Sequence, residues 1–552
     1  MITATPTKTT LSHHLIKLLQ AHHINHTFTT GQPLPFLTDQ PDFPVTSLVH
    51  DQATVHAADG YSRATGAVGV CFLYNHQAIP SAITAIATAK LDSVPLVILL
   101  QSSEHESRMS ADPFSMTQAL IKDYVRVNDK GELLPSIDAS LKLAKTGRPG
   151  IVIVDVDFQL FNAESDSTYN LIDDSVASST KQIKADKMTE ILTALKEAKQ
   201  PVILVGGGTV IGNASHELDC FIKQTRIPFV STLMGLGAID EDHPLHLGMV
   251  GMHGTYSANR AVHKADLLIC LGVRFSDRIT GKIKGFSPQS KKIQIDIDPA
   301  EINKLIPIEL PIIGDVKNVL AELNQLDLPK ALDTWQTEAC SWRQTSAKFH
   351  KVTHELLDPS IILTTLQQEA QSDCVVATDV GQHQMWTAHH FRLRNPRQFL
   401  TSGGFGTMGY GLPAAIGGAR KKPNQQVILV TGDGSFQMNL QELVTVSRER
   451  LNIKIAIFQN GYLGMVRQWQ QLFYQRQYSE VKISSPDFTA LASSYGINSG
   501  QAHTIEEAQA LIKRAMATDG PFVMTFTIED EKNVYPIVPP GGSNTEALLD
   551  GE

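Results

Sequence analysis

The chain has 552 residues, of which 42% are hydrophobic and 19% charged, with a formal net charge of −9. This length is too great for one hydrophobic core and predicts about three domains, whereas the charge density is too low for a disordered chain. No basic stripe is present, which argues against a nucleic-acid partner. The longest apolar runs have the length of a strand, so no membrane span is expected.

The first ten residues and the cysteines indicate the cellular compartment. Residues 1–10 are rich in Thr and do not lead into an apolar segment with a cleavage site, so we expect no secretion signal. The five cysteines are odd in number, widely spaced and mostly set in apolar segments. This usage is typical of reduced core thiols, and we therefore expect a cytoplasmic protein.

Along the chain, short β-branched runs alternate with amphipathic stretches, the pattern of parallel sheets covered by helices. The expected strands fall into three sets, at 69–73, 94–100 and 150–156, then at 201–205, 265–271 and 292–297, and finally at 373–377, 426–430, 453–458 and 522–527. A stretch rich in Ser and Asp, Glu164–Thr180, predicts a linker, and the pattern loosens again around 327–353. The sequence therefore predicts three doubly wound α/β domains, at residues 8–165, 185–328 and 355–540.

Two of the expected strands in the third domain end in polar, glycine-containing turns. The run 427–430 leads into Gly432-Asp433-Gly434, and the run 453–458 leads into Asn460, with 25 residues between Gly434 and Asn460. That spacing suits a parallel crossover, which would bring the two strand ends side by side. Glycines let backbone N–H groups approach an anion, and carboxylate and amide oxygens suit Mg²⁺. Taken alone, Gly-Asp-Gly is more typical of a tight turn, and the Asn at this spacing reverses that preference.

The two turns together resemble the signature of thiamine-diphosphate enzymes, a GDG followed after about 25 residues by NN, although the first Asn is Gln459 here. The resemblance implies that Mg²⁺ is bound by Asp433, Asn460 and the carbonyl of Tyr462. It also implies contacts to thiamine diphosphate from Val380, Gly381, Gln382, His383, Gly406, Met408, Gly432, Gly434 and Ser435. Without the resemblance, His383 would be interpreted as a surface histidine.

Three further segments narrow the resemblance. QHQMW at 382–386, GYLGMVRQWQ at 461–470 and NVYPIVPPG at 533–541 are similar to the catalytic subunit of acetolactate synthases, and the similarity covers roughly residues 45–540. The family decarboxylates pyruvate and joins the product to a second pyruvate or to 2-oxobutyrate in branched-chain amino acid biosynthesis. The catalytic positions that this implies are Asp51, Gln101, Met408, Met465 and Trp469. Spacing alone would place Met465 and Trp469 on one core-facing side of a helix.

The middle domain resembles the flavin-binding domain of the same family, in which FAD has a structural role. Glycines 206–208 follow a strand, and RFSDR at 274–278 follows another. The implied FAD contacts are Arg148, Gly207, His253, Gly254, Arg274, Asp296 and Asp315. Ser276 stands where the family usually has Asp. The family further implies a homodimer or homotetramer, in which the N-terminal pyrimidine-binding domain of one chain faces the diphosphate-binding domain of another, and it leaves room for a small regulatory subunit.

The first domain departs from the family pattern. Asp51 occupies the position of the Glu that faces N1′ of the aminopyrimidine, although an Asp here is also typical of a helix N-cap. Tyr74–Ser81 lacks both glycines of the family motif TSGPGATN, and Ser115 replaces a pocket Gln. We therefore expect cofactor binding to be better preserved than catalysis. The alternatives to an acetolactate synthase are a carboligase or lyase with other substrates and a weakly active, cofactor-binding paralogue.

Overall fold

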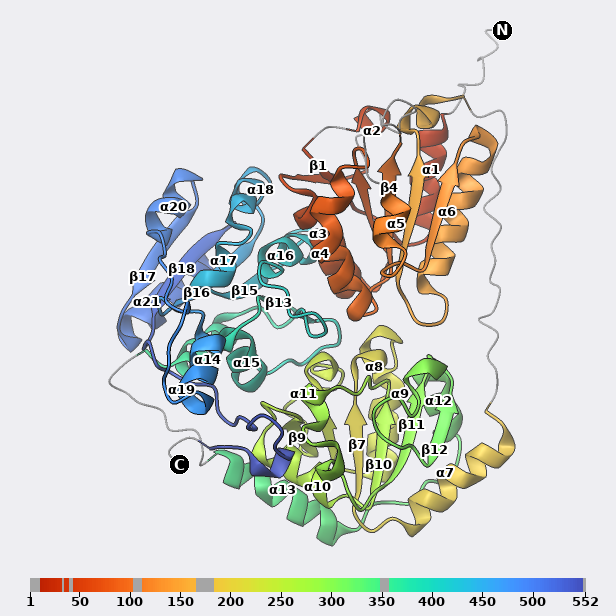
Figure 1. Cartoon of the computed structure of the whole chain (residues 1–552), viewed down its shortest axis with the longest axis vertical. Coiled ribbons are helices and arrows are strands. Elements are labelled where there is room, and N and C mark those ends of the chain that lie inside the picture. Colours follow the sequence, from red (N-terminus) through yellow and green to blue (C-terminus); the bar gives the residue numbers. More distant parts are fainter. Residues whose placement is uncertain are drawn as a thin grey trace.

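The computed structural model describes residues 10–31, 34–38, 43–102, 112–164, 183–347 and 357–549. Three six-stranded sheets follow one another along the chain, every strand pair is parallel, and helices flank each sheet (Figure 1). The predicted fold class, three doubly wound α/β domains, is confirmed. Apart from Glu164, the expected linker lies outside the described residues, and the polar connection after residue 327 begins with the helix α13 (Asp333–Ala347).

The first sheet has the strand order β2-β1-β3-β4-β6-β5. Its central strands β3, β4 and β6 are almost entirely buried and apolar, as a sheet covered on both faces requires. The strands are β1 (Thr27–Thr30), β2 (Val45–Leu48), β3 (Gly69–Leu73), β4 (Leu96–Gln101), β5 (Asp123–Val127) and β6 (Ile151–Val156). The helices are α1 (Leu11–Ala21), α2 (Pro35–Thr38), α3 (Asp51–Thr65), α4 (Ala78–Leu91), α5 (Pro113–Thr117) and α6 (Lys130–Lys145).

The second sheet has the order β12-β11-β10-β7-β8-β9, so the chain reverses its direction of travel between β7 and β10. Its strands are β7 (Pro201–Val205), β8 (Phe229–Ser231), β9 (His246–Met249), β10 (Leu267–Leu271), β11 (Lys291–Asp296) and β12 (Leu310–Ile313). The helices around it are α7 (Ala185–Glu197), α8 (Gly207–Ile211), α9 (Ser215–Thr225), α10 (Tyr256–Lys264), α11 (Asp277–Thr280) and α12 (Val316–Leu323).

The third sheet has the order β14-β13-β15-β16-β18-β17, and its reversal lies between β13 and β15. Its strands are β13 (Val375–Thr378), β14 (Phe399–Leu400), β15 (Val427–Gly432), β16 (Ile453–Gln459), β17 (Asn498–Ala502) and β18 (Phe522–Thr527). The helices are α14 (Pro359–Glu369), α15 (Gln382–His390), α16 (Gly411–Gly418), α17 (Asp433–Phe436), α18 (Leu443–Arg448), α19 (Gly464–Phe473), α20 (Phe488–Ser494) and α21 (Ile505–Ala517).

The first and third domains meet where α3 crosses α16 (Figure 1). The two backbones approach so closely that a Cβ atom at Gly60 would overlap the carbonyl of Ala414, and one at Gly417 would overlap the carbonyl of Ala57. Only glycine permits this approach at both positions. The crossing therefore joins the two domains directly through their main chains.

The chain end returns to the central domain. The N–H of Val538 donates to the carbonyl of Met252 at 2.8 Å, and the side chain of Asn544 donates to the carbonyl of Ile279 at 2.8 Å. The five cysteines, all within the described ranges, form no disulfide. None of the described helices combines the length and the apolar character needed to cross a membrane.

Candidate cofactor site

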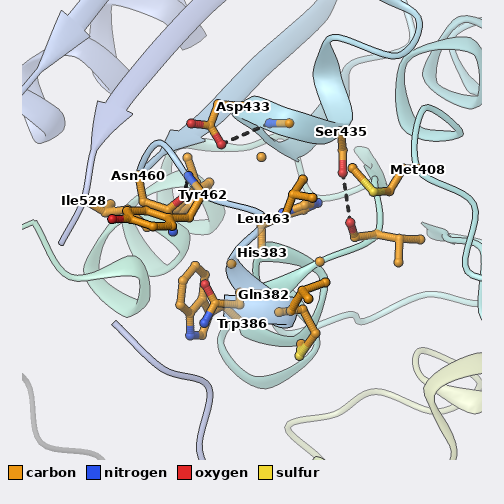
Figure 2. A pocket seen from close by; sticks show the side chains of 18 residues that line it. Gln382, His383, Trp386, Met408, Asp433, Ser435, Asn460, Tyr462, Leu463 and Ile528 are labelled. Atoms are coloured by element: carbon orange, nitrogen blue, oxygen red, sulfur yellow. Dashed lines mark hydrogen bonds between the residues drawn. The ribbon is translucent and has the colours of Figure 1, made fainter. Parts of the chain in front are cut away.

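A cavity lies at the carboxyl edge of the third sheet (Figure 2). The strands are in register there, since Thr378 pairs with Val430 and Gly432 pairs with Phe458. This edge includes the reversal between β13 and β15, which is where open α/β sheets bind ligands. The lining residues are Val380, Gly381, Gln382, His383, Trp386, Met408, Gly432, Asp433, Gly434, Ser435, Phe458, Asn460, Tyr462, Leu463, Gly464, Met465, Val466 and Ile528.

Asp433 joins the two glycine-containing turns. It is 1% exposed; one carboxylate oxygen accepts from the N–H of Gly434 at 3.0 Å, and the other accepts from the N–H of Gly461 at 2.8 Å and from Ser485 Oγ at 3.2 Å. Burial raises the pKa of this carboxyl, because loss of solvent disfavours its charged form by more than these hydrogen bonds favour it. Asn460 follows β16 on the same wall, and its Oδ1 accepts from the N–H of Tyr462 at 3.1 Å. A carboxylate and an amide oxygen side by side form a hard-oxygen site of the kind that Mg²⁺ prefers.

The first turn of α15 supplies the opposite wall. His383 is buried, its Nε2 has no hydrogen-bond partner, and burial lowers its pKa to about 3. Gln382 Oε1 is likewise unpaired. The amide nitrogen of Gln382 donates to Gln468 Oε1 and to the carbonyl of Lys532, both at 2.8 Å. Main-chain N–H groups at a helix start and a buried imidazole nitrogen that can donate fit a polyanionic ligand, whereas the Gln382 oxygen can only accept. The prediction of a surface histidine from the sequence alone is wrong.

Met408, Gly434 and Ser435 complete this wall. A side chain at Gly434 would meet Leu463, Ile483 and Met408, so the cavity needs glycine there. Ser435 Oγ donates to the carbonyl of Val380 at 2.9 Å and so fixes α17 against the end of β13 (Figure 2). Gly406 has φ +75° and lies next to Val380 without lining the cavity itself.

Three expected catalytic residues do not line the cavity of this chain. Asp51 is the first residue of α3, close to Thr30, and burial raises its pKa. Gln101 is the last residue of β4, and Trp469 packs edge-on against Phe473. The alternative reading of Asp51 as a helix N-cap is wrong by one position, because the cap is His50, whose Nδ1 accepts from the N–H of Gln52 at 3.2 Å.

Helix α19 does not turn Met465 and Trp469 toward the core as a pair. Met465 lines the cavity, and the fully buried side chains of this helix are Arg467 and Gln468. Arg467 donates to Asn533 Oδ1 at 2.8 Å and to the carbonyl of Lys532 at 2.7 Å. Gln468 pairs with the main chain of Val534 at 2.9 Å in both directions. The buried face of α19 therefore holds the chain end.

Several lining residues are not among the predicted site residues. They are Trp386, Phe458, Leu463, Gly464, Val466 and Ile528. Ile528 reaches the cavity because it follows β18, the strand next to β16 in the sheet. Gly464 is needed because a Cβ atom there would overlap Gln382 Oε1.

The altered segments of the first domain have local partners. His76 is buried, with Nε2 3.5 Å from Asp155, whose carboxylate also accepts from Tyr124 Oη at 2.7 Å and from Arg126 Nη2 at 3.0 Å. Asp112 caps the short helix α5 by accepting from the N–H of Ser115, and Ser115 Oγ donates to the same carboxylate at 2.6 Å. Both side chains are thus committed to contacts within their own domain.

The implied flavin contacts of the central domain gather at one sheet edge. Val205 pairs with Leu271, Leu271 with Ile295, and Asp296 with Ile313, so Gly207, Arg274, Asp296 and Asp315 all follow strand ends on the same side. Asp296 is buried, receives one bond from the N–H of Asp298 at 2.9 Å, and burial raises its pKa to about 6. A buried carboxylate at this edge is the group that binds ribose hydroxyls in dinucleotide sites, so these residues fit a flavin nucleotide.

The other implied flavin contacts have local partners as well. Arg148 pairs with Asp298 at 3.0 Å and with Glu301 at 2.7 Å, and Asp315 caps α12. His253 is enclosed, with Nδ1 3.2 Å from the carbonyl of Pro536, and burial lowers its pKa to about 4. Its neighbour Gly254 is packed against the amide of Asn259.

Three matched family models and the curated relatives agree with this geometry. The N-terminal TPP binding, central and C-terminal TPP binding domains of thiamine pyrophosphate enzymes match residues 9–123, 188–323 and 379–526. The fold and the site therefore define a thiamine-diphosphate enzyme.

The similarity to curated proteins is more specific and extends over nearly the whole chain. Acetolactate synthase isozyme 2 large subunit of Escherichia coli (strain K12) is 38% identical over 546 residues, covering 97% of this chain and 98% of the relative. A probable acetolactate synthase large subunit of Methanocaldococcus jannaschii is 39% identical over 558 residues, with 97% and 94% covered, and the large subunit of Corynebacterium glutamicum is 39% identical over 517 residues, with 90% and 82% covered. The chain belongs to the acetolactate synthase large-subunit family.

Proposed function

We propose that the protein decarboxylates pyruvate and joins the resulting two-carbon unit to a second 2-oxoacid, releasing CO₂ and forming 2-acetolactate when both substrates are pyruvate. Thiamine diphosphate, when bound, stabilises negative charge on the former carbonyl carbon of pyruvate. The observation that carries the proposal is the convergence of Asp433, Asn460 and His383 on one cavity, in a chain related to acetolactate synthases over almost its full length.

Within that cavity the chain's own residues have separate tasks. We assign Asp433, Asn460 and the carbonyl of Tyr462 to Mg²⁺, and the first turn of α15 with His383 to the diphosphate. Met408 and Met465 shape the apolar part of the wall. Asp51 is the acid–base group of the proposal, and it belongs to the first domain.

Incubating the purified protein with pyruvate, thiamine diphosphate and Mg²⁺ tests the proposal. We expect CO₂ and acetolactate in equal amounts. A different ligation product would favour a carboligase with another acceptor, and cofactor binding without CO₂ release would favour the weakly active paralogue. Competition between pyruvate and 2-oxobutyrate in the same assay measures the acceptor preference.

From the similarity to the family we also propose a cytoplasmic location and a small regulatory subunit as a partner.

The altered first-domain wall bears on the substrate range. His76 and Tyr74 stand where the family has small residues, and His76 is anchored to Asp155. We therefore propose that the rate is lower than in the related enzymes, even though the diphosphate wall is complete.

The domain limits 8–165, 185–328 and 355–540 remain part of the proposal, and each range encloses one of the three sheets.

We expect the purified protein to carry FAD on the edge that includes Asp296. A flavin with a structural role gives the protein a yellow colour that does not bleach when pyruvate is added without oxygen. Visible absorption spectra before and after pyruvate check this. Bleaching would indicate an oxidase, and a colourless protein that cannot be reconstituted with FAD would contradict the flavin assignment.

Two chains are expected to form each active site. Asp51 does not line the cavity of its own chain. The apolar side chains Val49, Met438 and Val444 of the first and third domains expose 49%, 56% and 38% of their surfaces. A second copy would cover these apolar side chains and bring its own carboxylate to the cavity. Light scattering coupled to an activity assay is expected to find a dimer or a dimer of dimers. An active monomer would be incompatible with this assembly.

A further inference from the structure

The connection between β2 and α3 leads directly to Asp51, and the third domain of the same chain holds this connection. The N–H of Val49 donates to both carboxylate oxygens of Glu442, at 3.0 and 3.3 Å. Glu442 is fully buried, and its Oε2 also accepts from Thr445 Oγ1 at 2.9 Å. A buried carboxylate depends on such donors to offset its desolvation, so its place is fixed by them. Through Val49, Glu442 in turn fixes the main chain two residues before Asp51.

Other side chains of the third domain bind the strand before it. Arg420 Nε donates to Thr46 Oγ1 at 2.9 Å, and Arg420 is itself paired with Glu449 at 2.6 Å. Arg448 donates to the carbonyl of Ser47. Bonds at three positions within four residues fix the direction of the strand end as well as its location.

The far end of α3 is anchored to the same domain. Tyr410 Oη donates to Asp59 at 2.7 Å, and Arg63 Nη1 donates to the carbonyl of Thr401 at 3.0 Å. Between the two ends lies the glycine crossing with α16. Helix α3 is therefore held at its start, its middle and its end, and Asp51 cannot move independently of the third domain.

From this arrangement we propose that Glu442 is a positioning residue for Asp51. Its carboxylate holds the Val49 peptide and thereby sets the place and direction of the first residue of α3. The inference rests on the proposed function, in which Asp51 acts on bound thiamine diphosphate. Glu442 also lies close in the sequence to the proposed metal ligand Asp433, which it follows by only nine residues.

Glu442→Gln tests the proposal, because Gln keeps the shape and one acceptor oxygen but loses the charge. We expect C2 proton exchange on bound thiamine diphosphate, followed by NMR in D₂O, to slow by about tenfold, since small misplacements of a catalytic group are costly. The Kd for thiamine diphosphate with Mg²⁺ should stay unchanged. Thr445→Val, which removes one donor to Glu442, should give a smaller loss in the same direction. Glu506→Gln, at an exposed glutamate of α21, is the matched control and should leave exchange at the native rate.

A double-mutant cycle separates positioning from a general effect on stability. In an Asp51→Asn background, Glu442→Gln should cause no further loss of C2 exchange, because its effect passes through Asp51. Amide hydrogen exchange of residues 46–52 in the cofactor-free protein should become faster in Glu442→Gln. Native C2 exchange in Glu442→Gln, or a loss that adds fully to that of Asp51→Asn, would overturn the proposal. A native protein that does not accelerate C2 exchange at all would instead refute the proposed function.

Discussion

Replacing Asp433 with Ala is expected to weaken the binding of thiamine diphosphate in the presence of Mg²⁺ by on the order of 100-fold or more. Mutations of groups that merely orient a metal ligand already cost 10–100-fold in affinity, so removal of a ligand should cost at least as much. Asp433 also accepts the N–H groups of Gly434 and Gly461, which hold the two turns together. The change should therefore loosen the cavity wall as well.

Calorimetric titration of the cofactor into the variant, with Mg²⁺ in excess, measures the effect. Circular dichroism should show native helix content, because the site lies at the edge of the sheet. Asp433→Asn keeps one acceptor oxygen for the turn contacts and serves if the alanine variant folds poorly. Asp519→Ala, which removes an exposed carboxylate before β18, should bind as the native protein does. Native affinity in Asp433→Ala would remove Asp433 from the metal site.

Asp51→Asn is expected nearly to abolish C2 proton exchange on bound thiamine diphosphate, and Asp51→Glu to increase it. The side chain of Asp is shorter than that of Glu by about 1.5 Å, one C–C bond. A misplacement on that scale costs about 10²-fold, or ~2.7 kcal/mol of barrier. The reference pKa values of Asp and Glu differ by only about 0.4, so acidity does not compensate for the distance. Burial raises the pKa of Asp51 and would act on a Glu at this position in the same direction. The length of the side chain is therefore the main difference.

Exchange rates measured for the three proteins at saturating cofactor check this expectation. Asp51→Glu need not restore full acetolactate synthesis, because His76 and Ser115 remain on the altered wall. If Asp51→Asn exchanged the proton at the native rate, Asp51 would not be the activating carboxylate, and a cofactor-binding paralogue would become the better description. Equal cofactor affinity in all three proteins is the control, since Asp51 does not line the cavity that contains Asp433 and Asn460.

Asp433 and Asn460 line the same cavity, as predicted from the sequence, because both residues follow strand ends. Parallel strands bring their carboxyl ends to one edge, so Asp433 and Asn460 could be placed together from their spacing alone. His383 needed the family likeness, because its burial follows from the packing of α15 against β15. Ile528 could not be placed, since nothing in a single apolar residue after a strand indicates which neighbouring strand it will accompany.

The surroundings of Asp51 depend on how two domains dock and so lay beyond the sequence. Glu442 and Val49 are 393 positions apart, and no local pattern indicates that they meet. The helix-cap alternative was misplaced by one residue, because His50 can accept a backbone hydrogen bond at the cap and thereby shifts Asp51 into the helix. The position of Trp469 outside the cavity likewise reflects which face of α19 holds the chain end.

The glycine crossing between α3 and α16 also bears on motion. Main chains in direct contact leave no side chains to slide or change rotamer between them, so the first and third domains should move as one rigid body. The central domain contacts this body through polar groups, such as Arg397 with Asn213, and through a shared apolar cluster in which Leu236 and Met249 pack against the third domain. Apolar packing between domains limits their relative motion. The thiamine-binding body should therefore keep its shape, and the central domain should follow its movements rather than swing independently.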